Sequence, residues 1–106
     1  MAKQFVTFGT VDEFPAGSRE VFDLDRLSII LFNVDGTFYA VENMCSHAEY
    51  ELDGGQLDGC SLECPKHGAW FDIRSGEALS APAYKAIKTF PVRVEADEVQ
   101  VELDVE

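Results

Sequence analysis

The sequence predicts an all-β domain, a small antiparallel β-sandwich or barrel. Short runs rich in β-branched and aromatic residues recur along the chain, and tight-turn residues separate them. Helical patterns are weak, because Thr10 and Glu13 match a capping box but Pro15 and Gly17 leave room for about one turn. With 106 residues, 46% of them hydrophobic, the chain can bury one core, so a single domain over residues 1–106 is expected.

The strands are expected at short intervals. Residues 28–34 (SIILFNV) are the most apolar of these runs, and Asp35-Gly36 separates them from residues 37–41, as in a β-hairpin. Two further tight turns are expected at residues 74–76 and 96–98. The predicted strands are, in order, residues 4–8, 20–24, 28–34, 37–41, 60–63, 69–73, 89–95 and 99–103.

The charge balance limits the partners. Twenty acidic and eight basic residues give a net charge of −12, which argues against nucleic acid and anionic membrane surfaces. It fits docking onto a basic protein surface, and it fits equally well a purely solubilising role. The amino terminus has no long apolar core, and the longest apolar run, residues 29–32, is too short to cross a bilayer. A cytoplasmic protein with no membrane contact is expected.

Residues 42–83 interrupt the strand pattern with loops rich in Cys, His, Gly and Pro. Both histidines and all three cysteines lie here, as Cys45-Ser46-His47, then sixteen residues, then Cys64-Pro65-Lys66-His67, with Cys60 between. Three cysteines in a chain without an export signal favour metal or redox chemistry over disulfides. Each loop pairs a thiolate with an imidazole, so two facing loops offer two sulfurs and two nitrogens to a metal centre.

Other interpretations remain open at this point. Cys₂His₂ is a common zinc set, although zinc sites usually pair like ligands, whereas each loop here carries one of each. A Cys–His nucleophile would leave the second pair unexplained. A purely structural role for the cysteines and histidines requires both pairs to arise by chance.

These residues resemble the signature of the Rieske [2Fe–2S] family, which reads here as Cys-x-His-x₁₆-Cys-x₂-His. The resemblance spans essentially the whole chain and implies the Rieske fold, with a cluster-binding part at about residues 42–83 formed by two Cys/His loops. The resemblance extends to Gly68, Phe71, Asp72, Gly76 and Pro82.

The resemblance implies one Rieske-type [2Fe–2S] cluster. Matched to the motif, Cys45 and Cys64 bind one iron, His47 and His67 bind the other, and Pro82 belongs to the loop that covers the cluster. Neutral imidazoles in place of two anionic thiolates make the cluster less negative, which raises its reduction potential above that of all-cysteine ferredoxins.

The function implied is that of a Rieske-type ferredoxin, a one-electron carrier rather than an enzyme, with no catalytic residues. In this family the carrier passes electrons from an NAD(P)H-dependent flavoprotein reductase to a terminal ring-hydroxylating dioxygenase. Both histidines are needed for the cluster, so a facial triad with two further histidines is impossible. The alternatives are a small Rieske-like subunit of an assimilatory nitrite reductase and a zinc-binding interaction module.

Four further expectations concern residues near the motif. Cys60 is expected to be a partly buried thiol that binds no metal, and with one spare cysteine the inter-loop disulfide of high-potential relatives cannot form. Those relatives carry Ser and Tyr where this chain has Ala69 and Phe71, which implies a low potential here. Trp70 and Phe71 either shield the cluster or belong to the core. Lys66 on one side, and Glu49, Glu51 and Asp53 on the other, either meet a partner or are simply solvated.

Overall fold

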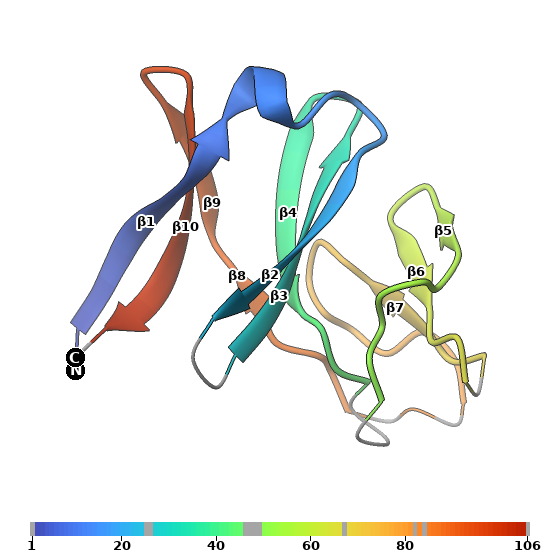
Figure 1. Ribbon diagram of the computed structural model, residues 1–106. Coiled ribbons are helices and arrows are strands. Elements are labelled where there is room, and N and C mark those ends of the chain that lie inside the picture. The colour runs from blue at the N-terminus through green and yellow to red at the C-terminus, as the bar shows by residue number, and fades with distance from the viewer. Residues whose placement is uncertain are drawn as a thin grey trace.

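The computed structural model describes residues 2–24, 27–45, 50–66, 68–81, 83 and 85–105. The strands form three antiparallel sheets, so the all-β prediction is confirmed (Figure 1). A single short 3₁₀ turn, Val11–Glu13, is the only helical element of the described ranges, and Glu13 accepts a 2.8 Å hydrogen bond from the backbone N–H of Thr10.

Each sheet has a simple strand order. The first sheet contains β1 (Ala2–Thr10), β10 (Glu98–Val105) and β9 (Val92–Glu95), in that order. The second contains β2 (Arg19–Leu24), β3 (Leu27–Val34), β4 (Thr37–Glu42) and β8 (Thr89–Phe90). The third contains β5 (Leu57–Asp58), β6 (Ser61–Glu63) and β7 (Trp70–Asp72).

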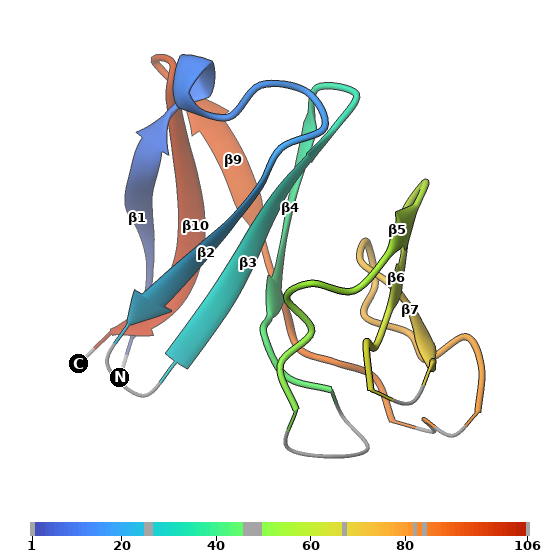
Figure 2. The ribbon, with the colours of Figure 1, turned by 45° about the vertical axis from the view of Figure 1, so that its right-hand side comes forward.

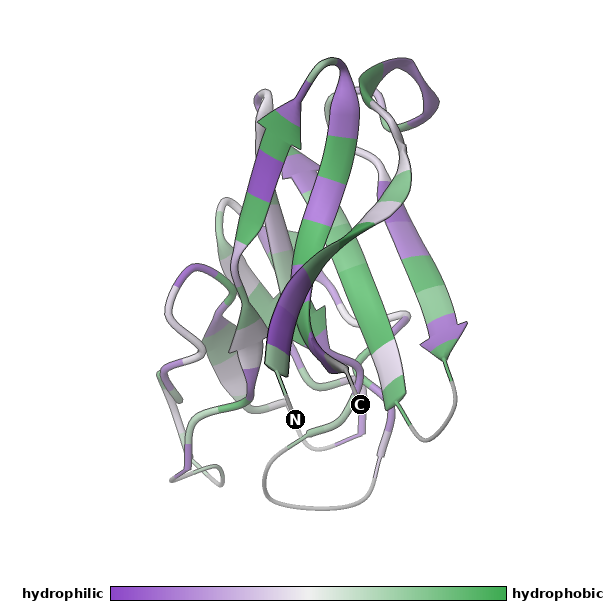
Figure 3. Cartoon of the chain, turned by 90° about the vertical axis from the view of Figure 1, so that its left-hand side faces the viewer, coloured by the Kyte–Doolittle hydropathy of each residue, from purple (hydrophilic) through white to green (hydrophobic). Residues whose placement is uncertain are grey.

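β3 is buried on both faces. Successive side chains of a strand point to opposite faces, and Figure 3 shows the resulting alternation of hydrophobic and hydrophilic residues along other strands of the molecule. Ile29 and Leu31 belong to the core between the first two sheets, which also contains Val99 and Val101 of β10. The alternate β3 residues belong to a second core, formed with the segment between β4 and β8. The unbroken apolar run of β3 therefore follows from its position between two cores.

The predicted hairpins are present. Asp35 and Gly36 both have positive φ, 53° and 92°, as a two-residue type I′ loop requires. Ala96 and Asp97, with φ of 50° and 66°, connect β9 to β10 in the same way, although neither is glycine.

Two expectations about strands are wrong. The predicted strand 89–95 is two strands in different sheets, because Pro91 between them has no N–H to donate to a ladder; its carbonyl accepts the N–H of Glu102 instead (2.9 Å). The second difference is β5, which was not predicted because a strand of two residues is too short to show an alternation of apolar and polar residues. Cys60, expected to begin a strand, lies in the turn between β5 and β6.

The segment between β4 and β8 leaves and re-enters the second sheet at neighbouring points. β4 pairs with β8 through Ala40↔Phe90 and Val41↔Thr89, so residues 43 and 88 flank one insertion. Figure 2 shows that the third sheet and its loops stand beside the first two sheets rather than within them. In the described part of the chain, no helix is long and apolar enough to cross a membrane.

Candidate metal centre

The two cysteine loops are closed in the same way. The backbone N–H of Cys45 donates to the carbonyl of Tyr50 (2.8 Å), and that of Cys64 donates to the carbonyl of Ala69 (2.7 Å). In both loops the acceptor lies five residues after the cysteine. Gly68, with φ of 74°, closes the second loop further by donating to the carbonyl of Cys64 (3.0 Å). The sequence therefore builds two matching loops, each beginning at a cysteine.

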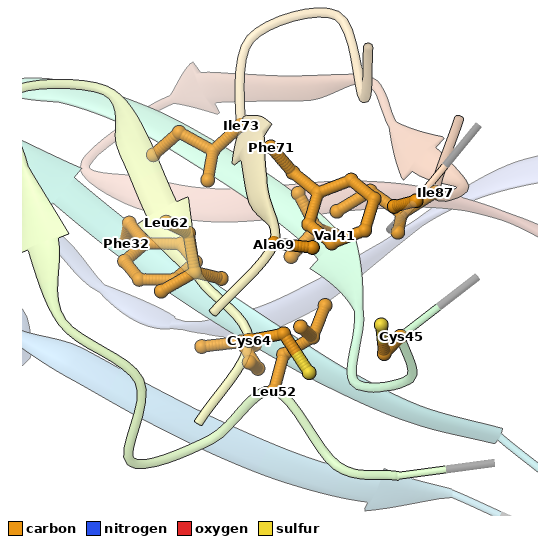
Figure 4. Close-up of a cluster of buried hydrophobic side chains, with 12 residues drawn as sticks. Phe32, Val41, Cys45, Leu52, Leu62, Cys64, Ala69, Phe71, Ile73 and Ile87 are labelled. Carbon is orange, nitrogen blue, oxygen red and sulfur yellow. The ribbon is translucent and has the colours of Figure 1, made fainter. Parts of the chain in front are cut away.

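Both cysteines that begin these loops are buried. Cys45 is 2% exposed and Cys64 is 0% exposed, and both belong to the second core. Figure 4 shows them on the same side of that core, with Leu52 next to Cys64. Neither forms a disulfide. The structure thus brings the two predicted sulfur ligands into one region.

These residues fit an iron–sulfur cluster. Two buried cysteines outside any disulfide offer soft sulfur ligands, which iron–sulfur clusters prefer, in a site that keeps most water away. His47 and His67, the other predicted ligands, lie outside the described residues. Within the described ranges, no three His, Cys, Asp or Glu side chains are grouped so that they could hold a metal ion.

Asn43 anchors the segment that follows the first loop, a role that sequence reasoning missed. Its side chain is buried; Oδ1 accepts the N–H of Asp53 (2.8 Å) and Nδ2 donates to Ser28 Oγ (3.2 Å). Nδ2 also lies 3.5 Å from a carboxylate oxygen of Glu51. The only sequence signal is an amide directly after a strand, which does not identify its partners.

Arg19 of β2 is a second anchor that the sequence did not indicate. Its Nη1 donates to the carbonyl of Gly55 (2.7 Å), while its guanidinium lies 5.3 Å from the centre of the Phe32 ring. Gly55 itself is packed so tightly that a Cβ would lie 1.8 Å from the carbonyl oxygen of Glu63. The segment after the first loop is therefore pressed against β6, which leads into the second loop.

The hairpin of β6 and β7 carries the second loop. Phe71 is fully buried in the second core, so the core interpretation of this ring is confirmed. Trp70 is half-buried; its backbone N–H donates to Ser80 Oγ (3.0 Å), and its backbone carbonyl accepts the N–H of Leu79 (2.7 Å). Pro82 lies outside the described residues, whereas Ala83 beside it is 4% exposed.

Charged groups around the loops are mostly exposed. Arg74 makes a paired contact with Asp72 at 2.9–3.0 Å, and these hydrogen bonds lower the pKa of the Asp72 carboxyl and raise the pKa of Arg74. The Lys66 ammonium lies 5.0 Å from the centre of the Tyr50 ring. This contact joins the two loops, and neither interpretation of Lys66 from sequence predicted it.

Cys60 lies apart from the two loop cysteines. It is half-buried against the second core and is free, so the expected partly buried thiol is confirmed. Its carbonyl accepts the N–H of Ile73 (2.9 Å), which joins the β5–β6 turn to the end of β7. The backbone of Cys60 therefore helps to hold the β5–β6 turn against the end of β7.

Comparison with known proteins assigns the fold and site to one class. Residues 4–91 match the model of the Rieske [2Fe–2S] domain. The chain belongs to the Rieske [2Fe–2S] family and binds one Rieske-type [2Fe–2S] cluster.

Relatives of similar length show which kind of Rieske protein this chain is. The chain is 36% identical over 104 residues to the ferredoxin component of the 2,4-dinitrotoluene dioxygenase system of Burkholderia sp. (strain RASC), covering 98% of this chain and 100% of the relative. It is similar to the ferredoxin of carbazole 1,9a-dioxygenase from Nocardioides aromaticivorans IC177, with a TM-score of 0.84 and 31% identity over 92% of this chain and 95% of that one. The chain is accordingly a Rieske-type ferredoxin, an electron carrier of the aromatic dioxygenase type and not itself a catalyst.

One further solved structure shows such a carrier with a partner. A ferredoxin chain in a complex of reduced oxygenase and oxidized ferredoxin of carbazole 1,9a-dioxygenase matches with a TM-score of 0.85 and 28% identity, over 92% of this chain and 91% of that one.

The alternatives from sequence receive less support. A Mycobacterium tuberculosis chain described as a nitrite reductase small subunit matches with a TM-score of 0.80 but 21% identity, over 100% of both chains, which shows the fold alone. Membership of a [2Fe–2S] family also removes the reason to retain the zinc module or the Cys–His nucleophile.

Proposed function

We propose that Cys45 and Cys64 bind one iron of the cluster and that His47 and His67 bind the other. The observation that supports this assignment is a pair of buried cysteines, neither in a disulfide, at the start of two loops closed alike. In each loop the histidine follows within three residues of the cysteine, inside the five-residue closure. In the sequence, each histidine therefore belongs to the same short segment as one of the two cysteines.

The electron path in this proposal runs from an NAD(P)H-dependent flavoprotein reductase, through this chain, to a terminal ring-hydroxylating oxygenase. When bound, the cluster supplies reversible one-electron reduction. The protein's part is to hold the ligands, since the second core fixes the sulfurs and the loop hydrogen bonds fix the backbone around them. The relatives named as ferredoxin components of dioxygenase systems support the assignment of both partners.

The cluster-binding part is assigned to about residues 42–83 of a single domain spanning residues 1–106, acting in the cytoplasm. The return of the chain from β4 to the neighbouring strand β8 supports the first assignment. The lack of a disulfide among Cys45, Cys60 and Cys64 supports the second, because thiols persist in reducing compartments.

A reductive titration tests the proposal. Protein produced with iron available is expected to contain about two irons and two acid-labile sulfides per chain and to accept one electron. The reduced protein is then mixed with the purified oxygenase and reductase of the 2,4-dinitrotoluene dioxygenase system, whose own ferredoxin it should replace. Stoichiometric zinc, or a chain that takes up no electron, contradicts the proposal.

A further inference from the structure

Lys66 and Tyr50 join the two ligand loops at their solvent side. Lys66 lies two residues after Cys64, and Tyr50 supplies the carbonyl that accepts the N–H of Cys45. The ammonium nitrogen is 5.0 Å from the ring centre, within the range of a cation–π interaction. One contact therefore connects the backbone closure of the first loop to the residue beside a proposed ligand in the second.

The surroundings of this contact are open to solvent. Tyr50 is 41% exposed and Lys66 is exposed, whereas the cysteines behind them are buried. Tyr50 also lines a hollow of about 470 Å³ with Glu51, Asp53 and Pro65. The contact thus lies at the rim of the site, between bulk water and the buried sulfurs.

Among the described residues, neither a disulfide nor an ion pair of Lys66 joins the loops at this rim. Cys45, Cys60 and Cys64 form no disulfide, so no such bond joins the loops. The ion pairs found among the described residues are Arg74–Asp72 and Arg93–Glu95, and neither involves Lys66. A lysine stem packed along an aromatic ring also buries apolar surface.

We propose that Lys66 and Tyr50 form a clasp that holds the two loops closed and slows escape of the cluster. The inference rests on the proposed ligand set. Separation of the loops at the rim would expose the sulfurs and let water or a chelator reach the metal. Because the clasp must open before that happens, its interaction energy adds to the barrier for cluster loss.

The experiment measures the rate of cluster loss. Protein with a full cluster is placed in moderate urea with an iron chelator, and bleaching of the visible absorbance is followed. Lys66→Met and Tyr50→Leu are each expected to speed bleaching about two- to five-fold, the range that a cation–π contact of this exposure supports. The double variant should bleach no faster than the faster single variant, because the two side chains form one interaction.

Conservative variants and a matched control separate the clasp from other effects. Lys66→Arg and Tyr50→Phe keep the cation and the ring, so both should bleach at the rate of the unmodified protein. Lys88→Met removes a similar contact, 5.3 Å from the Phe90 ring and outside the loops, and should also leave the rate unchanged.

The outcomes distinguish the clasp from the ligand assignment. Unmodified protein that contains no cluster contradicts the proposed function, whatever the variants do. Unmodified protein that contains a cluster, with Lys66→Met bleaching at the same rate, overturns the clasp alone. Two further results would overturn the clasp. If the double variant bleached faster than either single variant by the product of their effects, Lys66 and Tyr50 would act independently of each other. If Tyr50→Phe bleached as fast as Tyr50→Leu, the hydroxyl rather than the ring would be responsible.

Discussion

Arg19 and Gly55, which are far apart in the sequence, are joined by a 2.7 Å hydrogen bond from the Arg19 guanidinium to the Gly55 carbonyl. The bond connects an edge strand of the second sheet to the segment between the two ligand loops. It is partly buried, so its loss leaves a carbonyl without its partner.

Arg19→Met is expected to lower the free energy of unfolding by about 1.5–3 kcal/mol, the range for a hydrogen bond to a charged group. Methionine keeps an unbranched apolar side chain but removes the guanidinium, which both donates this hydrogen bond and lies 5.3 Å from the centre of the Phe32 ring. The thermal midpoint of the cluster-containing protein should fall by roughly 4–8 °C for each kcal/mol. Arg93→Met, which removes a guanidinium 4.0 Å from the Phe5 ring in the first sheet, should leave the rate of cluster loss unchanged, while Arg19→Met increases it.

Gly55→Ala tests the close approach of two chain segments. An added methyl would lie 1.8 Å from the Glu63 carbonyl oxygen, so the segment must move away from β6. We expect destabilisation of about 3 kcal/mol, the upper end for overpacked sites. Gly54→Ala is the control: it meets nothing within 4 Å, but its φ of 94° costs about 1 kcal/mol. Equal midpoints for the two variants would contradict the close packing.

Replacing a proposed histidine ligand should remove the cluster. His47→Ala and His67→Ala are each expected to lose the visible spectrum and the acid-labile sulfide, because ligation contributes to the folding of the loops. Cys60→Ser is the matched control, since Cys60 is the free cysteine outside the two loops, and it should keep a full complement of iron. A native spectrum in either histidine variant, or loss of iron in Cys60→Ser, would show that the ligand set is misassigned.

The potential is expected to lie towards the low end of the Rieske range of about −150 to +300 mV. Ala69 and Phe71 are both fully buried and carry no side-chain donor to a sulfur. Ala69→Ser combined with Phe71→Tyr should raise the potential, because hydrogen bonds to sulfur stabilise the more negative reduced state.

Voltammetry at one pH measures this shift. Phe38→Tyr, a half-buried ring that packs against the other core, should leave the potential unchanged. A high potential in the unmodified protein, or no rise in a double variant whose structure shows both new bonds, would mean that other factors set the potential.

Electron transfer to the oxygenase is expected to slow as salt increases. A net charge of −12 accelerates encounter with a basic docking face, and ions screen that attraction. Stopped-flow rates between low and moderate ionic strength test this. A rate independent of salt would mean that apolar contacts, rather than charge, drive docking. The exposed side chains of Met44, Tyr50 and Leu79 near the loops could make such contacts.

The parts of this molecule that were predictable from sequence are those encoded locally. The Asp35-Gly36 hairpin needs only two residues with positive φ, and the meeting of Cys45 and Cys64 in one core follows the two Cys–His pairs seen in the sequence. The contacts of Arg19 and Asn43 could not be foreseen, because each joins segments that meet only after the sheets assemble. The break at Pro91 was readable in principle, since proline rarely continues a central strand.

The pairing of β4 with β8 has a consequence for engineering. Because the chain departs and returns at adjacent backbone positions, residues 43–88 form a cassette that can be transplanted into another β-scaffold without stretching either junction. Ile30, Phe32 and Val41 would stay behind in the recipient, although their side chains complete the core of the cassette. A transplant that also supplies these three side chains should keep its cluster. One that omits them should contain the ligands but lack the apolar side chains that pack against them.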